Sequence, residues 1–127
     1  GLVNSTMYGN TVYEDPIAVA KEMVAELKSK QCDLIICLSH LGYDYGEAPY
    51  PSDIRLANEV SEIDLILGGH THTFMDEPYL LTNDQGFTTT INQVGWAGIN
   101  LGRIDILFDA NQKAMASSEL IKLEALA

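Results

Sequence analysis

The chain has 127 residues, the length of one ordinary domain, with 18 acidic and 7 basic side chains and a formal net charge of −11. This charge repels the phosphate backbone of a nucleic acid, and the sequence has no basic stripe that could bind one. The longest apolar stretches, such as residues 34–38, are far shorter than the ~20 residues that a membrane-spanning helix needs. We therefore expect a globular domain that neither binds nucleic acid nor spans a membrane.

The first third of the chain contains one clear helix. The opening GLVNSTMYGN has no initiator methionine, basic region or apolar region, so no targeting signal is visible. Residues 15–30 then predict a helix, with Asp15 as its N-cap and Pro16 at the first helical position. The apolar residues expected along one face are Ile17, Ala20, Met23, Val24 and Leu27.

Two strands joined by a helix are expected next. Residues 32–39 are almost continuously apolar, which is typical of a strand covered on both faces in a parallel sheet. After a loop rich in Gly, Tyr and Pro, residues 52–60 predict a helix with Ser52 as its N-cap, and residues 63–69 predict a second buried strand. This order favours two parallel strands joined by a right-handed crossover.

Two cysteines lie in or beside the first of these strands. Because successive side chains of a strand alternate between its faces, Cys32 and Cys37 should point to opposite sides. We expect two small buried side chains, with no disulfide between them.

The C-terminal third is richer in strand signals. Residues 87–95 and 102–109 contain many β-branched residues and predict strands. The tail from 113 to 123 has two interpretations: its composition favours a helix, whereas residues 109–112 suit a hairpin turn that would lead into another strand.

All three histidines of the chain follow the two predicted parallel strands. His40 comes directly after the first strand, His70 after the second, and His72 two residues later. Because the carboxyl ends of parallel strands meet at one edge of a sheet, His40 and His70 should lie together, and an extended segment would turn His72 the same way. Gly68 and Gly69 would let the backbone approach closely.

Three convergent imidazoles indicate a metal site. Neutral imidazole is a common ligand of zinc and also binds manganese, iron or nickel. A metal ion would supply the local positive charge that a phosphate ester needs near so acidic a chain. The competing interpretation is that each histidine is a hydrogen-bonded structural residue; the absence of any other histidine in the sequence favours the metal site.

The motifs around the histidines resemble those of a known family. SHLGYDYG at 39–46 and GGHTHTF at 68–74 are similar to the two C-terminal motifs of the calcineurin-like metallophosphoesterases, most closely the 5'-nucleotidase branch. Residues 15–42, 52–74 and 93–109 resemble that branch as well, so the likeness covers nearly the whole chain.

The resemblance implies a fold and a metal centre. The fold is α/β, part of a four-layer α/β/β/α sandwich of mixed sheets with flanking helices, in which residues 113–123 form a strand paired with 103–108. His40 and His70 would bind one divalent metal ion and His72 a second, zinc, manganese or similar. Two such ions, about 3.5–4 Å apart, clamp a phosphate and lower the pKa of the attacking water.

The resemblance also implies an activity. It is hydrolysis of a phosphoric monoester, with a nucleotide as the expected small-molecule substrate. Relatives of this kind are often periplasmic or extracellular.

The N-terminal motifs of the family are missing from this sequence. They are Asp-x-His, Gly-Asp and Asn-His-Glu, which supply the remaining metal ligands and a transition-state histidine. Residues 1–127 therefore resemble the C-terminal portion of a catalytic domain without its N-terminal metal-binding half, and GLVNSTMYGN looks like the exit of a strand from that half. We expect this chain alone to bind metal weakly or not at all and to be inactive; its catalytic and substrate-binding residues stay unassigned.

Two other functions remain open. In a mononuclear zinc hydrolase the three histidines would suffice, with water in the fourth position. Alternatively, the chain is a non-catalytic folded fragment whose exposed half-core associates with another chain, including a second copy of itself.

Several residues near the motifs have two interpretations. The loop tyrosines, Tyr43, Tyr45 and Tyr50, either line the site or pack within their loop. Trp96 packs either near the site or in the core. Asp44 and Asp53 either help to hold water or ligands or occupy solvated surface positions, and we expect the latter. No role follows from the sequence for Asn92 and Gln93.

Overall fold

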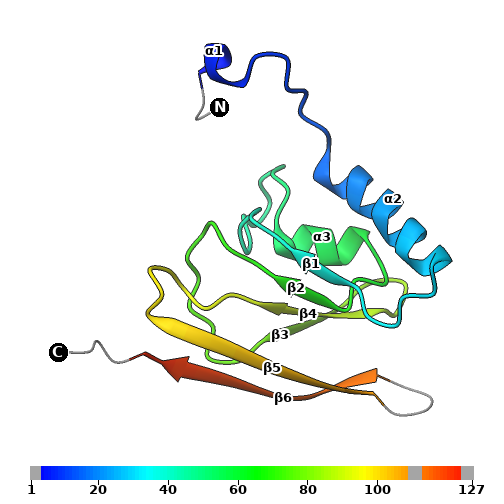
Figure 1. Cartoon of the computed structure of the whole chain (residues 1–127), viewed down its shortest axis with the longest axis vertical. Helices are drawn as coiled ribbons and strands as arrows, with labels where there is room; N and C mark the ends of the chain where they lie inside the picture. The colour runs from blue at the N-terminus through cyan, green and yellow to red at the C-terminus, as the bar shows by residue number, and fades with distance from the viewer. Residues whose placement is uncertain (1–3, 109–112, 124–127) are drawn as a thin grey trace.

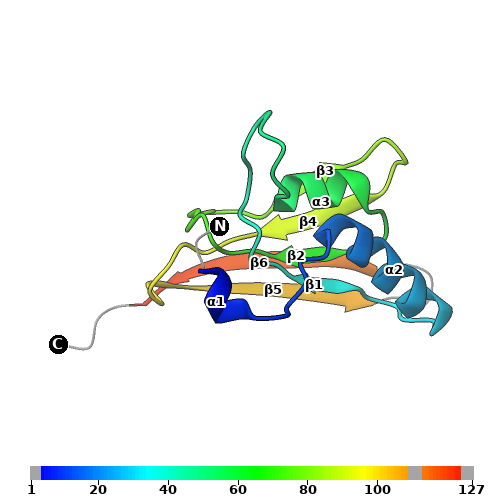
Figure 2. The same ribbon diagram turned by 90° about the horizontal axis from the view of Figure 1, so that it is seen from above.

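The computed structural model describes residues 4–108 and 113–123, which form an α/β fold with mixed sheets (Figure 1). The helices are α1 (Ser5–Tyr8), α2 (Pro16–Ser29) and α3 (Asp53–Glu59), and the strands are β1 (Ile36–Leu38), β2 (Leu65–Leu67), β3 (Tyr79–Thr82), β4 (Thr88–Asn92), β5 (Asn100–Phe108) and β6 (Lys113–Lys122). Figures 1 and 2 show α2 and α3 on one side of the β1–β4 sheet and the β5–β6 hairpin on its other side. The α/β class and the partial sandwich expected from the sequence are confirmed.

Capping residues set the start of both longer helices, as the sequence predicted. The Asp15 carboxylate accepts a hydrogen bond from the Ala18 backbone N at 2.9 Å, and α2 follows it. The Ser52 hydroxyl accepts one from the Arg55 N at 3.1 Å at the start of α3. These bonds satisfy backbone donors that have no partner within the helix.

The larger sheet has the strand order β1-β2-β4-β3. β1 runs parallel to β2, with Leu38 opposite Leu67, and β2 runs parallel to β4, with Ile66 opposite Ile91. β3, which was not predicted, pairs antiparallel with β4. The predicted parallel pair joined by a helix is therefore present, and the carboxyl ends of β1 and β2 lie at one edge.

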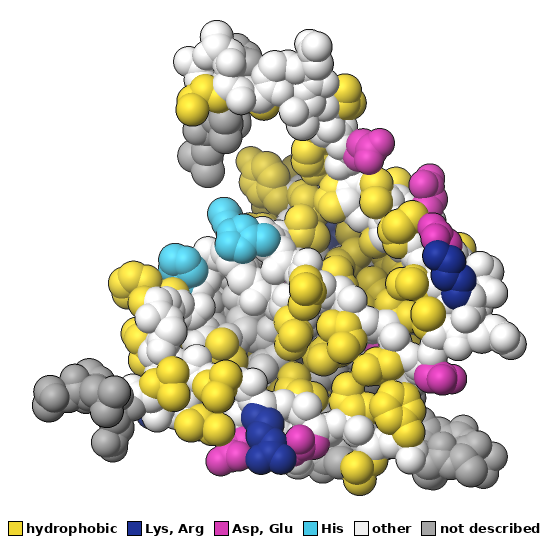
Figure 3. Space-filling model, viewed as in Figure 1, with side chains coloured by type: hydrophobic (Ala, Val, Ile, Leu, Met, Phe, Trp, Pro, Cys, Tyr) yellow, Lys and Arg dark blue, Asp and Glu magenta, His cyan; other side chains and the backbone are white. Residues whose placement is uncertain are grey.

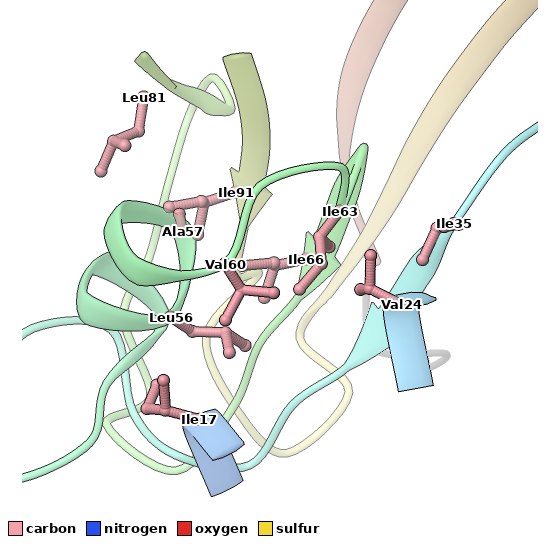
Figure 4. Packing of buried hydrophobic residues seen from close by; sticks show 10 residues of the cluster. All are labelled: Ile17, Val24, Ile35, Leu56, Ala57, Val60, Ile63, Ile66, Leu81 and Ile91. Atoms are coloured by element: carbon pink, nitrogen blue, oxygen red, sulfur yellow. The ribbon is translucent and has the colours of Figure 1, made fainter. Parts of the chain in front are cut away.

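The core lies between this sheet and the two longer helices. Ile66 and Ile91 are fully buried, and residues of α2 and α3 pack onto them (Figure 4). The other members of this cluster are Ile17, Val24, Ile35, Leu56, Ala57, Val60, Ile63 and Leu81. Met23, which was expected on the buried face of α2, is instead 46% exposed.

The prediction that the first strand is covered on both faces is wrong. β1 spans only Ile36–Leu38 at the edge of its sheet, where Ile35 and Cys37 contact the core. The alternate side chains point away from the helices, and Ile36 is 45% and Leu38 81% exposed. An apolar face of the sheet is therefore left open.

The C-terminal tail forms a strand, against its helical propensity. β6 pairs antiparallel with β5 over its whole length, with Leu101 opposite Ile121 and Arg103 opposite Glu119. Pairing with a neighbouring strand supplies partners for the backbone groups, which outweighs the weak intrinsic preference for helix. The predicted turn at 109–112 lies outside the described residues.

Two smaller expectations concern the first ten residues and the cysteines. Residues 5–8 form the short helix α1, with Asn4 accepting a hydrogen bond from the Thr6 N at 3.1 Å, and the interpretation of residues 1–10 as the exit of a strand stays a prediction. Cys32 and Cys37 are both free, but they are half-buried and both pack against the core cluster, so the expectation that they are buried on opposite sides of the strand is wrong. In the part of the chain that the structure describes, no helix is long and apolar enough to cross a membrane.

Candidate metal centre

His40 and His70 lie next to each other at the carboxyl edge of the sheet. His40 follows β1 and His70 follows β2, and the bond from the Ser39 N to the Leu67 O, 2.9 Å long, continues the pairing of these strands. The two imidazole rings meet edge to face, with centroids 5.3 Å apart. Both residues are exposed. Figure 3 shows histidines at two neighbouring places on this surface.

His72 is held differently from what the sequence suggested. The segment is not extended, because His70 and His72 have φ angles of 75° and 55°. The His72 ring stacks on the indole of Trp96, with centroids 5.7 Å apart and an angle of 12° between the planes. Among the described residues, no group of three or more His, Cys, Asp or Glu side chains is placed to hold a metal ion. The pair of His40 and His70 thus offers two nitrogen ligands, and His72 stands apart beside Trp96.

The glycine pair before His70 permits two close approaches. A Cβ atom on Gly69 would lie 3.1 Å from the Nδ1 of His40, so the His40 ring rests on the backbone of this residue. A Cβ on Gly68 would lie 2.0 Å from the Oδ2 of Asp53. A histidine ring and a buried carboxylate therefore contact the chain where the sequence predicted close approach.

Asp53 is a buried residue of the site, so the expectation of a solvated surface position is wrong. Its side chain is fully buried at the start of α3. The Ser39 hydroxyl donates a hydrogen bond to Oδ1, and the Nε2 of Gln93 donates to Oδ2 at 2.8 Å. Asp44, in contrast, is exposed as expected, and its carboxylate accepts a hydrogen bond from the Gly46 N.

Gln93, for which the sequence gave no role, extends this network to the histidine loop. Its Nε2 also donates to the Gly69 carbonyl at 3.1 Å, while its Oε1 accepts from the Thr73 N at 3.3 Å and from the Thr71 hydroxyl at 3.2 Å. The Thr71 hydroxyl in turn accepts from the Tyr43 N at 3.0 Å. Three segments far apart in the sequence are thereby joined at the residues next to His70 and His72.

Burial changes the titration of two groups here. Desolvation raises the pKa of Asp53, and the hydrogen bonds from Ser39 and Gln93 offset part of this rise. Desolvation, with a smaller contribution from the Asp53 charge, also raises the pKa of the Cys37 thiol. Cys37 is therefore a protonated thiol at neutral pH and a poor metal ligand.

The aromatic residues near the site have distinct environments. The Tyr45 hydroxyl donates to the Leu41 carbonyl at 2.9 Å, and the Tyr45 ring contacts the Tyr50 ring, so both pack within their loop. Tyr43 contacts Tyr79 of β3. Trp96 is 55% exposed and stacked on His72, so it lies at the site and not in the core.

Comparison with known proteins finds relatives of one kind, although no family model matches the chain. The chain is 32% identical over 116 residues to the trifunctional nucleotide phosphoesterase protein YfkN of Bacillus subtilis, covering 91% of this chain and 7% of that protein. It is 33% identical over 138 residues to a 5'-nucleotidase of Vibrio parahaemolyticus, covering 94% of this chain and 25% of the relative. Human 5'-nucleotidase is 28% identical over 121 residues, with coverage of 85% and 20%.

Solved structures give the same result for the fold. The 5'-nucleotidase precursor from Thermus thermophilus superimposes with a TM-score of 0.75 at 28% identity, covering 88% of this chain and 23% of that one. The NAD nucleotidase of Haemophilus influenzae has a TM-score of 0.75 at 20% identity, which supports the fold alone, and covers 93% and 25%.

Together, the sequence similarity and the α/β fold show that the chain resembles part of a nucleotide phosphoesterase protein and of several 5'-nucleotidases. More narrowly, most of these similar proteins are 5'-nucleotidases, the branch that the two histidine motifs resemble. The chain spans between 7% and 25% of the length of the relatives described above.

Proposed function

We propose that this chain is part of a metal-dependent phosphoric monoester hydrolase that acts on nucleotides. The observation that supports this most is the contact between His40 and His70, whose ring centroids lie 5.3 Å apart at the carboxyl edge of two parallel strands. Two exposed histidines at such an edge suit a divalent ion, and the relatives are 5'-nucleotidases.

In this proposal His40 and His70 hold one divalent ion, zinc, manganese or similar, and His72 holds a second. The ions would supply positive charge for the phosphate and activate a water molecule for attack. The chain's own contribution is to orient the ligands: Gly69 lets the His40 ring rest on the backbone, and Trp96 stacks on His72. Because the chain carries a net charge of −11, phosphate binding depends on that local positive charge.

The donor set within this chain is partial. Zinc is usually bound by four ligands, and His40 and His70 provide two. We propose that residues 1–127 are the C-terminal portion of a catalytic domain whose N-terminal half supplies further ligands, so that this chain alone is inactive. We also propose a periplasmic or extracellular location, in keeping with the 5'-nucleotidase precursor among its relatives.

Isothermal titration calorimetry with zinc and manganese tests the partial donor set. We expect weak or absent binding by the 127-residue chain, because two neutral imidazoles do not offset the positive charge of a divalent ion and leave its other ligand positions unfilled. As a control, Asp44→Asn removes an exposed carboxylate beside the site and should change nothing. Tight binding of two equivalents would show that the chain is self-sufficient and that the proposed missing half is wrong.

The mononuclear three-histidine alternative is not favoured by the geometry. In the described residues His72 is stacked on Trp96, while His40 and His70 contact each other. Three imidazoles around one ion would require the His72 segment to leave that stack.

The open apolar face favours a second property, self-association of this chain. Ile36, Leu38 and Leu67 are 45%, 81% and 38% exposed on neighbouring strands, and Figure 3 shows hydrophobic side chains gathered on this surface. Such patches tend to be covered by another chain. Sedimentation velocity should show concentration-dependent dimers that Leu38→Ser weakens. Val12→Ser, at a residue 79% exposed before α2, is the matched control, and a monomer at every concentration would contradict this proposal.

A further inference from the structure

A buried carboxylate connects the two loops that carry the histidines. Asp53 accepts hydrogen bonds from Ser39, the neighbour of His40, and from Gln93, which also donates to Gly69, the neighbour of His70. We propose that Asp53, acting through Ser39 and Gln93, is a positioning residue that sets the His40 and His70 rings against each other. Its link to metal binding rests on the function proposed above, whereas its effect on the two rings does not.

Asp53 determines which groups of the network donate hydrogen bonds and which accept them. A carboxylate only accepts hydrogen bonds, so Gln93 must turn its NH₂ group toward it. This leaves the Oε1 of Gln93 facing the Thr73 N and the Thr71 hydroxyl, both of which can donate to it. If the amide were reversed, its NH₂ group would face the Thr73 N–H, donor against donor. The carboxylate of Asp53 therefore fixes the orientation of the Gln93 amide, which binds the loop of His70 and His72.

The surrounding packing leaves little freedom for this arrangement. A Cβ on Gly68 would lie 2.0 Å from the Oδ2 of Asp53 and 2.7 Å from the Nε2 of Gln93. Asp53 is 0% and Gln93 2% exposed, so water cannot replace a lost partner easily. The Asp53 N donates a hydrogen bond to the Gly42 O at 2.8 Å, which ties the start of α3 to the loop after His40. The Tyr43 N donates to the Thr71 hydroxyl at 3.0 Å, which ties this loop to the loop of His70 and His72.

The network lies next to the histidines, so its effect on the two rings can be told apart from its effect on the stability of the whole fold. The Ser39 hydroxyl also accepts a hydrogen bond from the Leu41 N at 3.2 Å. The residues before and after His40 are therefore held together through the same hydroxyl that binds Asp53. The His40 ring in turn lies against Gly69, whose carbonyl binds Gln93. A change at Asp53 should therefore move the rings, whereas a loss of stability elsewhere should not.

The test is the nuclear Overhauser effect between the ring protons of His40 and His70 in the isotope-labelled 127-residue chain. The wild type should show this cross-peak, and Asp53→Asn should lose it, because the NH₂ group that replaces one carboxylate oxygen cannot accept the hydrogen bond that Ser39 or Gln93 donates there. Asp44→Asn makes the same chemical change on the exposed loop and should keep it. Ile91→Val, which lowers stability in the core, should also keep it.

Ser39→Ala serves if Asp53→Asn does not fold, because it removes only one hydrogen bond of the carboxylate; it should weaken the same cross-peak. A cross-peak of wild-type intensity in the folded Asp53 or Ser39 variant would overturn the proposal. Loss of the cross-peak in Ile91→Val as well would also overturn it, because the effect would then be one of general stability. The measurement uses neither metal nor substrate, so its failure is separate from a failure of the proposed hydrolase function.

Discussion

Gly68 is the residue whose backbone contacts the polar network most closely. A methyl group there would lie 2.0 Å from the Oδ2 of Asp53, which is fully buried and cannot move into solvent. We predict that Gly68→Ala lowers the free energy of unfolding by about 1–3 kcal/mol, the usual cost of overpacking. Urea denaturation measures this. Gly69→Ala is the control, because its methyl group would lie farther from its neighbour, 3.1 Å from the Nδ1 of the exposed His40 ring; equal stability of both variants would contradict the packing described here.

Asp53 should make stability depend on pH in a defined direction. Burial raises its pKa above the ordinary value of 3.8, so the folded state binds this proton more tightly than the unfolded state. The resulting stabilisation is present below about pH 4 and is lost as the pH rises through the folded pKa. We predict that the free energy of unfolding of the wild type, minus that of Asp53→Asn, falls between pH 4 and pH 7. A difference that rises over this range would contradict the raised pKa.

The sequence identified the histidines of the site but not the residues that hold them. His40 and His70 could be placed together because each follows a strand, and strand signals are local. The network of Asp53, Gln93 and Ser39 consists of hydrogen bonds between residues 14 and 40 positions apart in the sequence, which no local pattern reveals. The available hint was the pair of glycines at 68 and 69, which indicated that something approaches the backbone without showing what.

The helix α2 depends on its cap. The Asp15 carboxylate accepts a hydrogen bond from the Ala18 N at 2.9 Å, and Pro16 occupies the first turn. We predict that Asp15→Ala lowers the free energy of unfolding by about 1 kcal/mol, whereas Glu22→Ala in the middle of the same helix changes it little. Thermal or urea unfolding followed by circular dichroism distinguishes the two. Equal effects would show that the cap contributes nothing specific.

Helices were easier to predict than strands in this chain. The bounds of α2 and α3 agree with the predicted ranges to within a residue or two, because Asp15 and Ser52 mark their starts. β3 was missed because it has four residues next to Pro78 and is defined by its pairing with β4. Burial of β1 on both faces was wrong because an apolar run does not show whether a second layer of the protein covers it.

As a whole, the molecule is an acidic α/β domain with one open apolar face and a pair of histidines beside it. Its relatives are 5'-nucleotidases, of which it spans a quarter or less. Our proposal explains both the open apolar face beside β1 and the partial set of metal ligands by the same missing part of the domain. Both would be completed by the N-terminal half of the catalytic domain, which would cover Leu38 and bring further ligands to His40 and His70.

The central claim is that His40 and His70 bind a metal ion on which phosphate-ester hydrolysis depends. The most direct measurement is the rate of nucleoside monophosphate hydrolysis, with divalent metal, by a protein that joins this chain to the N-terminal half we propose. We predict metal-dependent turnover that His70→Ala lowers by several orders of magnitude and Tyr45→Ala lowers far less, with no significant turnover by the 127-residue chain alone. Hydrolysis at an unchanged rate in His70→Ala would contradict the account.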